Sequence, residues 1–164
     1  MSSDIKWKVL VVDDSSVNNL LLKDLLENHG YEVLLASGGK SALQLNKKHN
    51  PHFILLDLSM PGMDGFEVLE VLKPKKGIPP QVLIVTASVN NEIKKKTLEK
   101  GAFSYLVKPL DMSLIVNELE EAHIATVPGE AFGAPDNIRI SFATSDENLE
   151  KALKQFKEAV AVLH

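Results

Sequence analysis

The sequence predicts an α/β protein built on a doubly wound parallel sheet. Between about 7 and 122, short apolar runs alternate five times with segments whose apolar residues recur at helical spacing. Two of these runs, 53–56 and 82–85, are apolar at every position, which is typical of strands buried on both faces. This alternation predicts parallel strands, right-handed crossovers and helices on both faces of the sheet.

The first strand is expected at 7–12, where the apolar run stops at an acidic pair. Ser15 or Ser16 can cap the helix that follows, and Gly30 fits the end of that helix. Four residues recur at the spacing of an apolar helix face: Val17, Leu20, Leu21 and Leu25.

The second strand is expected at 31–36 and the second helix at about 40–49, ending before Pro51. The third helix is expected to begin at Asp64. Its expected buried positions are Phe66, Val68, Leu69 and Leu72.

A loop rich in lysine, proline and glycine at 73–80 leads to the last elements. These are expected as strand 82–85, helix 91–100, strand 103–107 and helix 111–122.

Composition limits the classes of function. The chain has 164 residues, of which 45% are hydrophobic, enough for one ordinary domain with an extension. Its net charge of −4 argues against a general nucleic-acid binder, and the absence of cysteine excludes disulfides and thiolate metal sites. No apolar run reaches the roughly 20 residues that span a bilayer, and residues 1–4 lack a signal-peptide pattern, so we expect a cytoplasmic protein without membrane contacts.

Polar side chains follow four of the expected strands. Asp13 and Asp14 end the first strand, Asp57 the third, Thr86 the fourth and Lys108 the fifth. Because parallel strands bring their carboxyl ends to one edge of the sheet, we expect these side chains to converge. Three carboxylates in one place repel each other, and a hard divalent cation such as Mg²⁺ or a nearby ammonium relieves the repulsion.

One carboxylate of such a cluster can act as a nucleophile toward phosphorus, with the metal, the lysine and the hydroxyl neutralising the phosphoryl oxygens. Asp57 is the best candidate, because it is central and follows the most apolar strand. Asp13 and Asp14 are better placed as metal ligands. Each residue alone has a simpler interpretation, such as a turn residue, a helix start or a solvated lysine, and only their combination predicts function.

Four motifs carry a family resemblance: Val11-Val12-Asp13-Asp14, the run from Leu55-Leu56-Asp57 through Ser59-Met60-Pro61-Gly62 to Asp64-Gly65, Val85-Thr86-Ala87, and Tyr105-Leu106-Val107-Lys108-Pro109. With this order and spacing, the region from about 5 to 122 resembles the receiver domain of two-component response regulators. The resemblance implies a flavodoxin-like (CheY-like) sheet of order 2-1-3-4-5, with 1–122 as the receiver domain.

The resemblance also implies roles for the pocket residues. Asp57 would be the phosphoacceptor, phosphorylated by a histidine kinase or a phosphotransfer protein, in a domain that is not an enzyme beyond self-catalysed phosphotransfer and dephosphorylation. Asp14, Asp57 and the backbone carbonyl of Ser59 would hold Mg²⁺, with Asp13 acting through water. Thr86 and Lys108 would bind the phosphoryl group.

Two further features follow from the same resemblance. Tyr105 would be the switch aromatic that moves inward when Thr86 moves toward the phosphate. The Lys108-Pro109 peptide bond is expected to be cis.

The run Lys94-Lys95-Lys96 is open to two interpretations, a solvated helix face or a place where partners dock. A homodimer could form through the face of the fourth helix and fifth strand.

The region 123–164 departs from the alternation and is expected to fold as an extension packed on the receiver. Strands are expected at 124–127 and 137–142, joined by a turn-rich loop, followed by a helix capped by Thr144 or Ser145. The apolar stripe of this helix comprises Leu149, Ala152, Leu153, Phe156, Val160 and Leu163. The stripe needs a surface to cover it, on this chain or on a second copy.

The run from Glu120 to Gly133, followed by 138–143, resembles the C-terminal end of class I aminotransferases, which use pyridoxal phosphate. Arg139 falls where that family's arginine binds the substrate carboxylate, although an exposed residue on a strand is the simpler interpretation. The cofactor lysine and the large domain have no counterpart, so no transaminase activity is expected. The meeting of two signatures near 117–122 raises an alternative: an engineered chimeric scaffold without signalling activity.

Overall fold

The computed structural model describes residues 6–72, 79–125, 127–128 and 138–139. The chain divides into two compact units, Met1–Val116 and Asn117–His164, each of which is considered by itself.

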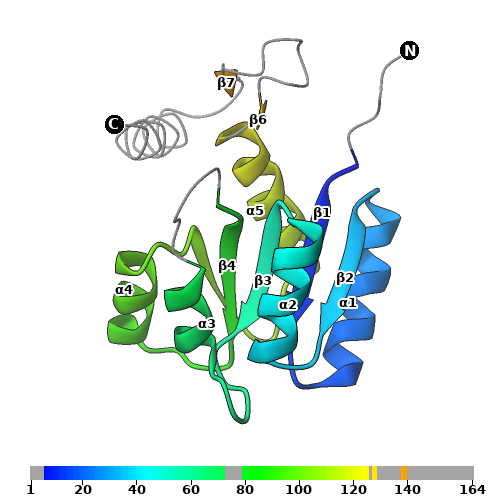
Figure 1. Ribbon diagram of the computed structural model, residues 1–164. Helices are drawn as coiled ribbons and strands as arrows, with labels where there is room; N and C mark the ends of the chain where they lie inside the picture. The colour runs from blue at the N-terminus through cyan, green and yellow to red at the C-terminus, as the bar shows by residue number, and fades with distance from the viewer. Residues whose placement is uncertain (1–5, 73–78, 126, 129–137, 140–164) are drawn as a thin grey trace, which may run out of the picture. The chain divides into compact units, whose positions relative to one another are not determined.

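Strands and helices alternate through the first unit and into α5, and all the strands of this region pair in parallel in the order β2-β1-β3-β4-β5 (Figure 1). The elements are β1 Lys8–Val12, α1 Ser16–Asn28, β2 Glu32–Ala36, α2 Gly39–His49, β3 Phe53–Asp57, α3 Gly65–Val71, β4 Gln81–Thr86, α4 Asn91–Glu99, β5 Ser104–Val107 and α5 Met112–Ala125. The predicted fold class and strand order are confirmed.

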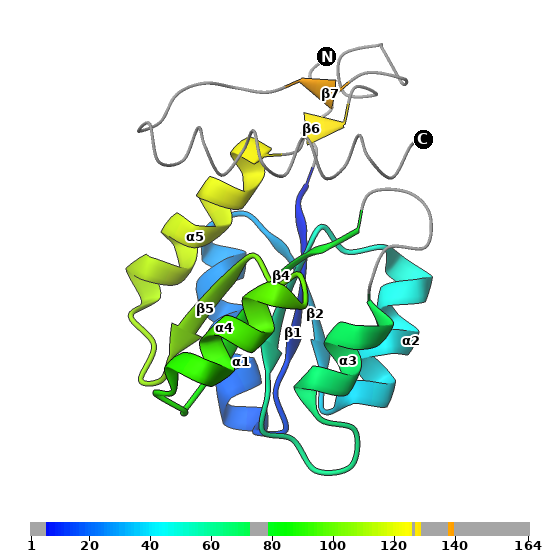
Figure 2. The same ribbon diagram turned by 90° about the vertical axis from the view of Figure 1, so that its left-hand side faces the viewer.

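The helices cover both faces of the sheet. Figures 1 and 2 show α1 on one face and α2 and α3 on the other. Ile93 of α4 packs against the same buried cluster as Ala42 of α2 and Val68 of α3. Every residue of β3 is buried, which explains why its sequence shows no polar alternation.

The apolar face of α1 differs from the one that the spacing predicted. Val17, Leu20 and Leu21 are 64%, 61% and 55% exposed. The buried residues of α1 are Asn19, Leu22 and Leu26. Leucines lie on more than one side of this helix, so apolar spacing alone does not decide which side faces the sheet. The buried face is the one that carries Asn19, whose amide binds backbone carbonyls at the strand ends.

The third helix begins as predicted, with Asp64 as its N-cap. The Asp64 side chain accepts the backbone N–H of Glu67, while Glu67 accepts the backbone N–H of Asp64, a reciprocal capping box. Val68 and Leu69 are buried, whereas Phe66 and Leu72 are only partly buried. The start of α3 is therefore fixed immediately after the β3–α3 loop.

The second unit contains a short antiparallel pair, β6 Val127–Pro128 and β7 Ile138–Arg139. The strand expected at 124–127 is wrong in its first half, because α5 continues to Ala125 and its helical hydrogen bonds take up those residues. Only the part of 137–142 at Ile138–Arg139 is described as a strand. The final helix and its apolar stripe lie outside the described residues.

Gly39 and Gly38 offer a matched test of packing at the start of α2. A Cβ on Gly39 would lie 2.6 Å from Met63 Cγ and 2.7 Å from Val68 Cγ2, whereas a Cβ on Gly38 would meet nothing within 4 Å. We expect Gly39→Ala to reduce the free energy of unfolding by about 1–3 kcal/mol through overpacking. Gly38→Ala should cost under about 1 kcal/mol, the loss of a favourable N-cap residue. Urea denaturation measures both, and equal losses would contradict the proposed contact between α2 and α3.

His52, just before β3, makes stability depend on pH. Its Nδ1 accepts the backbone N–H of Lys8 at 3.0 Å, and its ring packs on Trp7. Burial, followed by the positive charge of Lys8, lowers the pKa of His52 below its ordinary value of 6.5. The unfolded chain therefore takes up a proton that the folded chain resists. The neutral His52 ring contributes to stability above pH 6.5, and this contribution is lost as the pH falls through the pKa of His52 in the folded chain.

This loss is measured by comparing the wild type with His52→Asn in urea denaturation at pH 7.5 and pH 5.5. The stability difference in favour of the wild type should shrink at the lower pH, by a small amount because the ring is half exposed. A difference that grows at pH 5.5 would show that the sign is wrong.

Candidate functional site

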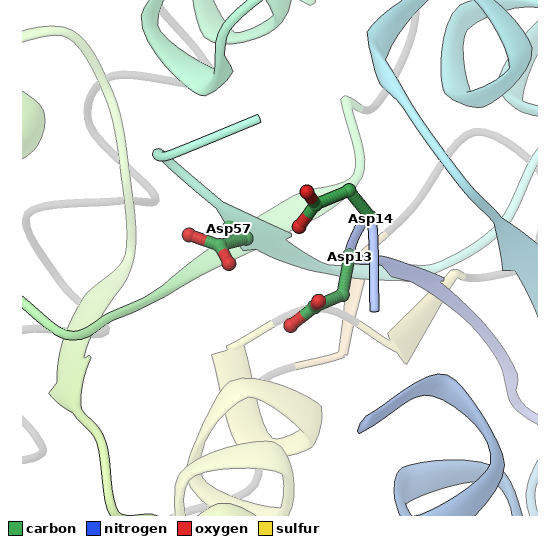
Figure 3. A group of neighbouring side chains, drawn as sticks. All are labelled: Asp13, Asp14 and Asp57. Carbon is green, nitrogen blue, oxygen red and sulfur yellow. The ribbon is translucent and has the colours of Figure 1, made fainter. Parts of the chain in front are cut away.

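Three carboxylates gather at the carboxyl ends of β1 and β3. Asp13 and Asp14 directly follow β1, and Asp57 is the last residue of β3. One ligand atom from each residue lies within 4.8 Å of the others, and Figure 3 shows the three side chains together. Asp13 and Asp57 are only 3% and 5% exposed, whereas Asp14 is exposed. The predicted convergence of the acidic residues is confirmed.

Lys108 joins two of these carboxylates. Its ammonium donates to Asp13 Oδ2 at 2.7 Å and to Asp57 Oδ2 at 2.8 Å. Partial burial lowers the pKa of Lys108, but the hydrogen bonds and charges of Asp13 and Asp57 outweigh it and hold the pKa above the usual value. The lysine therefore stays charged and offsets part of the repulsion between the two acids.

The position of Lys108 is set by the backbone at the end of β5. Its N–H donates to the carbonyl of Thr86 at 2.8 Å, which extends the pairing of β4 and β5 by one bond. The Lys108-Pro109 peptide bond is cis, as predicted. The chain turns away at this point, while the lysine side chain reaches back to the carboxylates.

The β3–α3 loop holds the side chain of Asp57. The Asp57 Oδ1 accepts the backbone N–H of Ser59 at 2.9 Å, and Ser59 itself is exposed beside the acids. Gly65 lies against this turn, because a Cβ there would meet the carbonyl oxygen of Asp57 and would lie 2.7 Å from the Cα of Leu58. Glycine is thus needed where α3 passes closest to the end of β3.

Thr86 and Tyr105 are linked through one residue of the β4–α4 loop. Thr86 is fully buried, and its Oγ1 accepts the backbone N–H of Ser88 at 3.2 Å. The Tyr105 hydroxyl donates to the carbonyl of Ser88 at 2.7 Å. Asp57 pairs with Val85 in the register of β3 and β4, so Thr86 extends one residue beyond Asp57. Sequence reasoning missed Ser88, because it contributes only backbone groups.

Asp13 is held by the start of α1 as well as by Lys108. Its Oδ1 accepts the N–H of Ser15 at 2.8 Å, and its Oδ2 accepts from Asn18 Nδ2 at 3.1 Å. Ser15 is also the N-cap, whose side chain accepts the N–H of Asn18. Asn18 was not among the residues predicted for the site. A signal was available, since a polar residue in the first turn of a helix can reach back to a carboxylate just before it.

This donor set suits a hard divalent cation. All the side-chain donors are carboxylate oxygens, as Mg²⁺ or Ca²⁺ prefers, and one lysine leaves the group of three acids with net negative charge. Asp13, Asp14 and Asp57 could therefore hold a metal ion.

Other residues that the sequence singled out lie elsewhere. Lys94, Lys95 and Lys96 are all exposed on α4, and Lys96 also places its ammonium 4.6 Å from the centre of the Phe66 ring. All three lysines thus fit a solvated face, and Lys96 also contacts a ring of α3. Arg139 lies in β7, where its backbone pairs with that of Val127. Among the described residues, no helix is both long enough and apolar enough to cross a membrane.

The fold and the pocket together define a class of protein: a doubly wound α/β domain with a lysine-bridged acidic site at the carboxyl edge of its sheet. The model of the response regulator receiver domain matches residues 9–120, and the chain belongs to this family.

Similar proteins agree with this assignment. Sporulation initiation phosphotransferase F of Bacillus subtilis is 35% identical over 109 residues, which cover 66% of this chain and 86% of that protein. Probable transcriptional regulator ycf27 of Porphyridium aerugineum is 32% identical over 157 residues, which cover 91% of this chain but only 62% of that regulator. The chain thus spans less than two thirds of the regulator's length.

A solved structure, the CheX–CheY–BeF₃–Mg²⁺ complex of Borrelia burgdorferi, matches with a TM-score of 0.67 and 29% identity, covering 72% of this chain and 90% of that one. None of these comparisons supports the aminotransferase resemblance of the C-terminal region or the chimeric alternative.

Proposed function

We propose that this receiver takes up a phosphoryl group on Asp57 in a magnesium-dependent reaction. The observation that carries the proposal is the Asp57 carboxylate itself: it is buried at a strand end, bound by Lys108 and by the N–H of Ser59, and close to two further acids. The Mg²⁺ ligands would be Asp14, Asp57 and the Ser59 carbonyl, with Asp13 acting through water. When bound, the metal would supply positive charge for the phosphoryl oxygens.

The chemistry is transfer from a phosphohistidine. An oxygen of Asp57 forms the bond to phosphorus while the bond between phosphorus and the histidine nitrogen breaks, and that nitrogen keeps the electron pair. Lys108, already placed at Asp57 Oδ2, stabilises the negative charge on the group being transferred. A small acyl phosphate can serve as donor in the same way, so uptake without a kinase is also proposed.

The hydrogen bonds of the β4–α4 loop support a switch. If the Thr86 hydroxyl turns to a phosphoryl oxygen, it gives up its hydrogen bond with the Ser88 N–H. The carbonyl of the same residue, Ser88, accepts the hydrogen bond of the Tyr105 hydroxyl. A shift of this one residue would therefore change the position of Tyr105 and the face formed by α4 and β5. Phosphorylation can select one of the two conformations if their free energies differ by only a few kcal/mol.

The exposed side of α1 supports docking of the phosphohistidine donor next to the pocket. Val17, Leu20 and Leu21 form an exposed apolar stripe on a helix that begins two residues after Asp14. The stripe begins three residues after Asp14, so a donor protein whose histidine reaches the pocket could contact it. Apolar residues grouped on an otherwise polar surface are typical of protein contacts. Dimerisation through the α4 and β5 face stays a prediction.

Asp57→Asn tests the phosphoacceptor. Incubation with acetyl phosphate and Mg²⁺ should add one acid-labile phosphoryl group to the wild type and none to Asp57→Asn, because the amide is not a nucleophile toward phosphorus. Asp24→Asn, on the exposed side of α1, should behave like the wild type. Intact-mass spectrometry reads the outcome, and uptake by Asp57→Asn equal to that of the wild type would contradict the proposal.

Leu20→Asp tests the docking face. Transfer from a phosphorylated histidine kinase, chosen from a panel as the fastest donor, should slow by about tenfold or more, the effect of losing roughly 1.4 kcal/mol of binding. Uptake from acetyl phosphate should not change, since the pocket is intact. Val71→Asp, at the exposed end of α3, is the control. Equal slowing by both variants, or none by Leu20→Asp, would place the docking face elsewhere.

A further inference from the structure

Two consecutive asparagines in α1 both hold Asp13. Asn18 Nδ2 donates to the carboxylate oxygen Oδ2 at 3.1 Å. Asn19 Nδ2 donates to the backbone carbonyls of Asp13 at 2.8 Å and Ala36 at 3.2 Å. One asparagine thus restrains the side chain of Asp13 and the other restrains its backbone.

The donors around Asp13 leave its carboxylate little freedom. Oδ1 accepts the N–H of Ser15, and Oδ2 accepts from both Asn18 and Lys108. A carboxylate offers about four lone-pair positions, so three donors occupy most of them. The two oxygens of Asp57 accept one donor each, from Ser59 and Lys108. Asp13 is therefore the more completely bound acid and is suited to act on a metal through a water molecule.

Asn19 fixes the backbone that carries the acidic pair. The N–H of Asp13 donates to the carbonyl of Ala36 at 3.2 Å, and the Asn19 amide bridges this carbonyl and that of Asp13. The ends of β1 and β2 and the first turn of α1 are thus joined at one point. Asn19 is 5% exposed, and its Oδ1 has no hydrogen-bond partner among the residues that the structure describes, which costs free energy. A buried amide at this cost is consistent with a positioning role.

Asn18 is not needed to cap the helix. The side chain of Ser15 is the N-cap and accepts the backbone N–H of Asn18, which any residue would supply. Among the described residues, the hydrogen bond of the Asn18 side-chain amide is the one to Asp13. Its removal should leave the helix start intact.

We propose that Asn18 is a positioning residue for the acidic pocket. It holds Asp13 where this acid can act on Mg²⁺ through a water molecule, and it thereby sets the affinity for Mg²⁺. This inference rests on the proposed magnesium-dependent function. Partners that orient the groups around a metal typically change its affinity by about 10- to 100-fold when they are removed. Asn19 supports the same acid from its backbone side.

The test is a calorimetric titration of the full chain with Mg²⁺ alone, for the wild type, Asn18→Ala and Asn28→Ala. Asn28 is exposed at the last position of the same helix and controls for the change from asparagine to alanine. The dissociation constant for Mg²⁺ should rise by about tenfold in Asn18→Ala and stay within about twofold of the wild type in Asn28→Ala. The thermal midpoint without metal should be the same in both variants.

A second readout separates positioning from chemistry. In Asn18→Ala, the Mg²⁺ concentration that gives half-maximal uptake from acetyl phosphate should rise by the same factor, while the rate at saturating Mg²⁺ stays within about twofold of the wild type. An unchanged or tighter dissociation constant in Asn18→Ala would overturn the inference. If the wild type binds Mg²⁺ but takes up no phosphate, the phosphoacceptor proposal fails, while the calorimetric result still decides the role of Asn18.

Discussion

The repulsion among three carboxylates at one edge of the sheet is the constraint on which the rest of the structure depends. Parallel strands force this meeting, because Asp13 and Asp57 end adjacent strands in register, where Val12 pairs with Leu56. The ammonium of Lys108 lies between the two buried acids and keeps its charge through those same contacts. One positive charge cannot balance three negative ones. The pocket thus retains a demand for positive charge, which the proposed magnesium ion would meet.

Much of the surrounding structure positions this pocket. Gly65 lets α3 approach the end of β3, and the capping box of Asp64 and Glu67 fixes where that helix begins. On the other strand, Ser15 and Asn18 hold the Asp13 carboxylate from the first turn of α1. These two donors on Asp13, a backbone N–H and a side-chain amide, are close in the sequence and uncharged. They can hold this acid without adding charge to the site.

The fold and the pocket could be predicted from the sequence because both depend on strong, local signals. Unbroken apolar runs predict buried strands, and polar residues at the ends of such runs predict one shared edge. The orientation of α1 could not be predicted, since leucines lie on several of its sides and Val17, Leu20 and Leu21 proved to be exposed. The buried side is set by Asn19 reaching the carbonyls of Asp13 and Ala36, a tertiary contact without a local pattern. Ser88 was missed for a related reason: its backbone, not its side chain, makes the contacts.

Ser88 is also the residue through which the proposed switch would connect the pocket with the surface. Its N–H and its carbonyl belong to one residue, with Thr86 on one side and Tyr105 on the other. These two groups belong to the peptide units on either side of the Ser88 Cα, so only the φ and ψ torsions of Ser88 separate them. Thr86 is fully buried, whereas Tyr105 is only partly buried. The proposed switch would therefore run through the backbone of Ser88, from the buried Thr86 hydroxyl to the partly exposed Tyr105 ring.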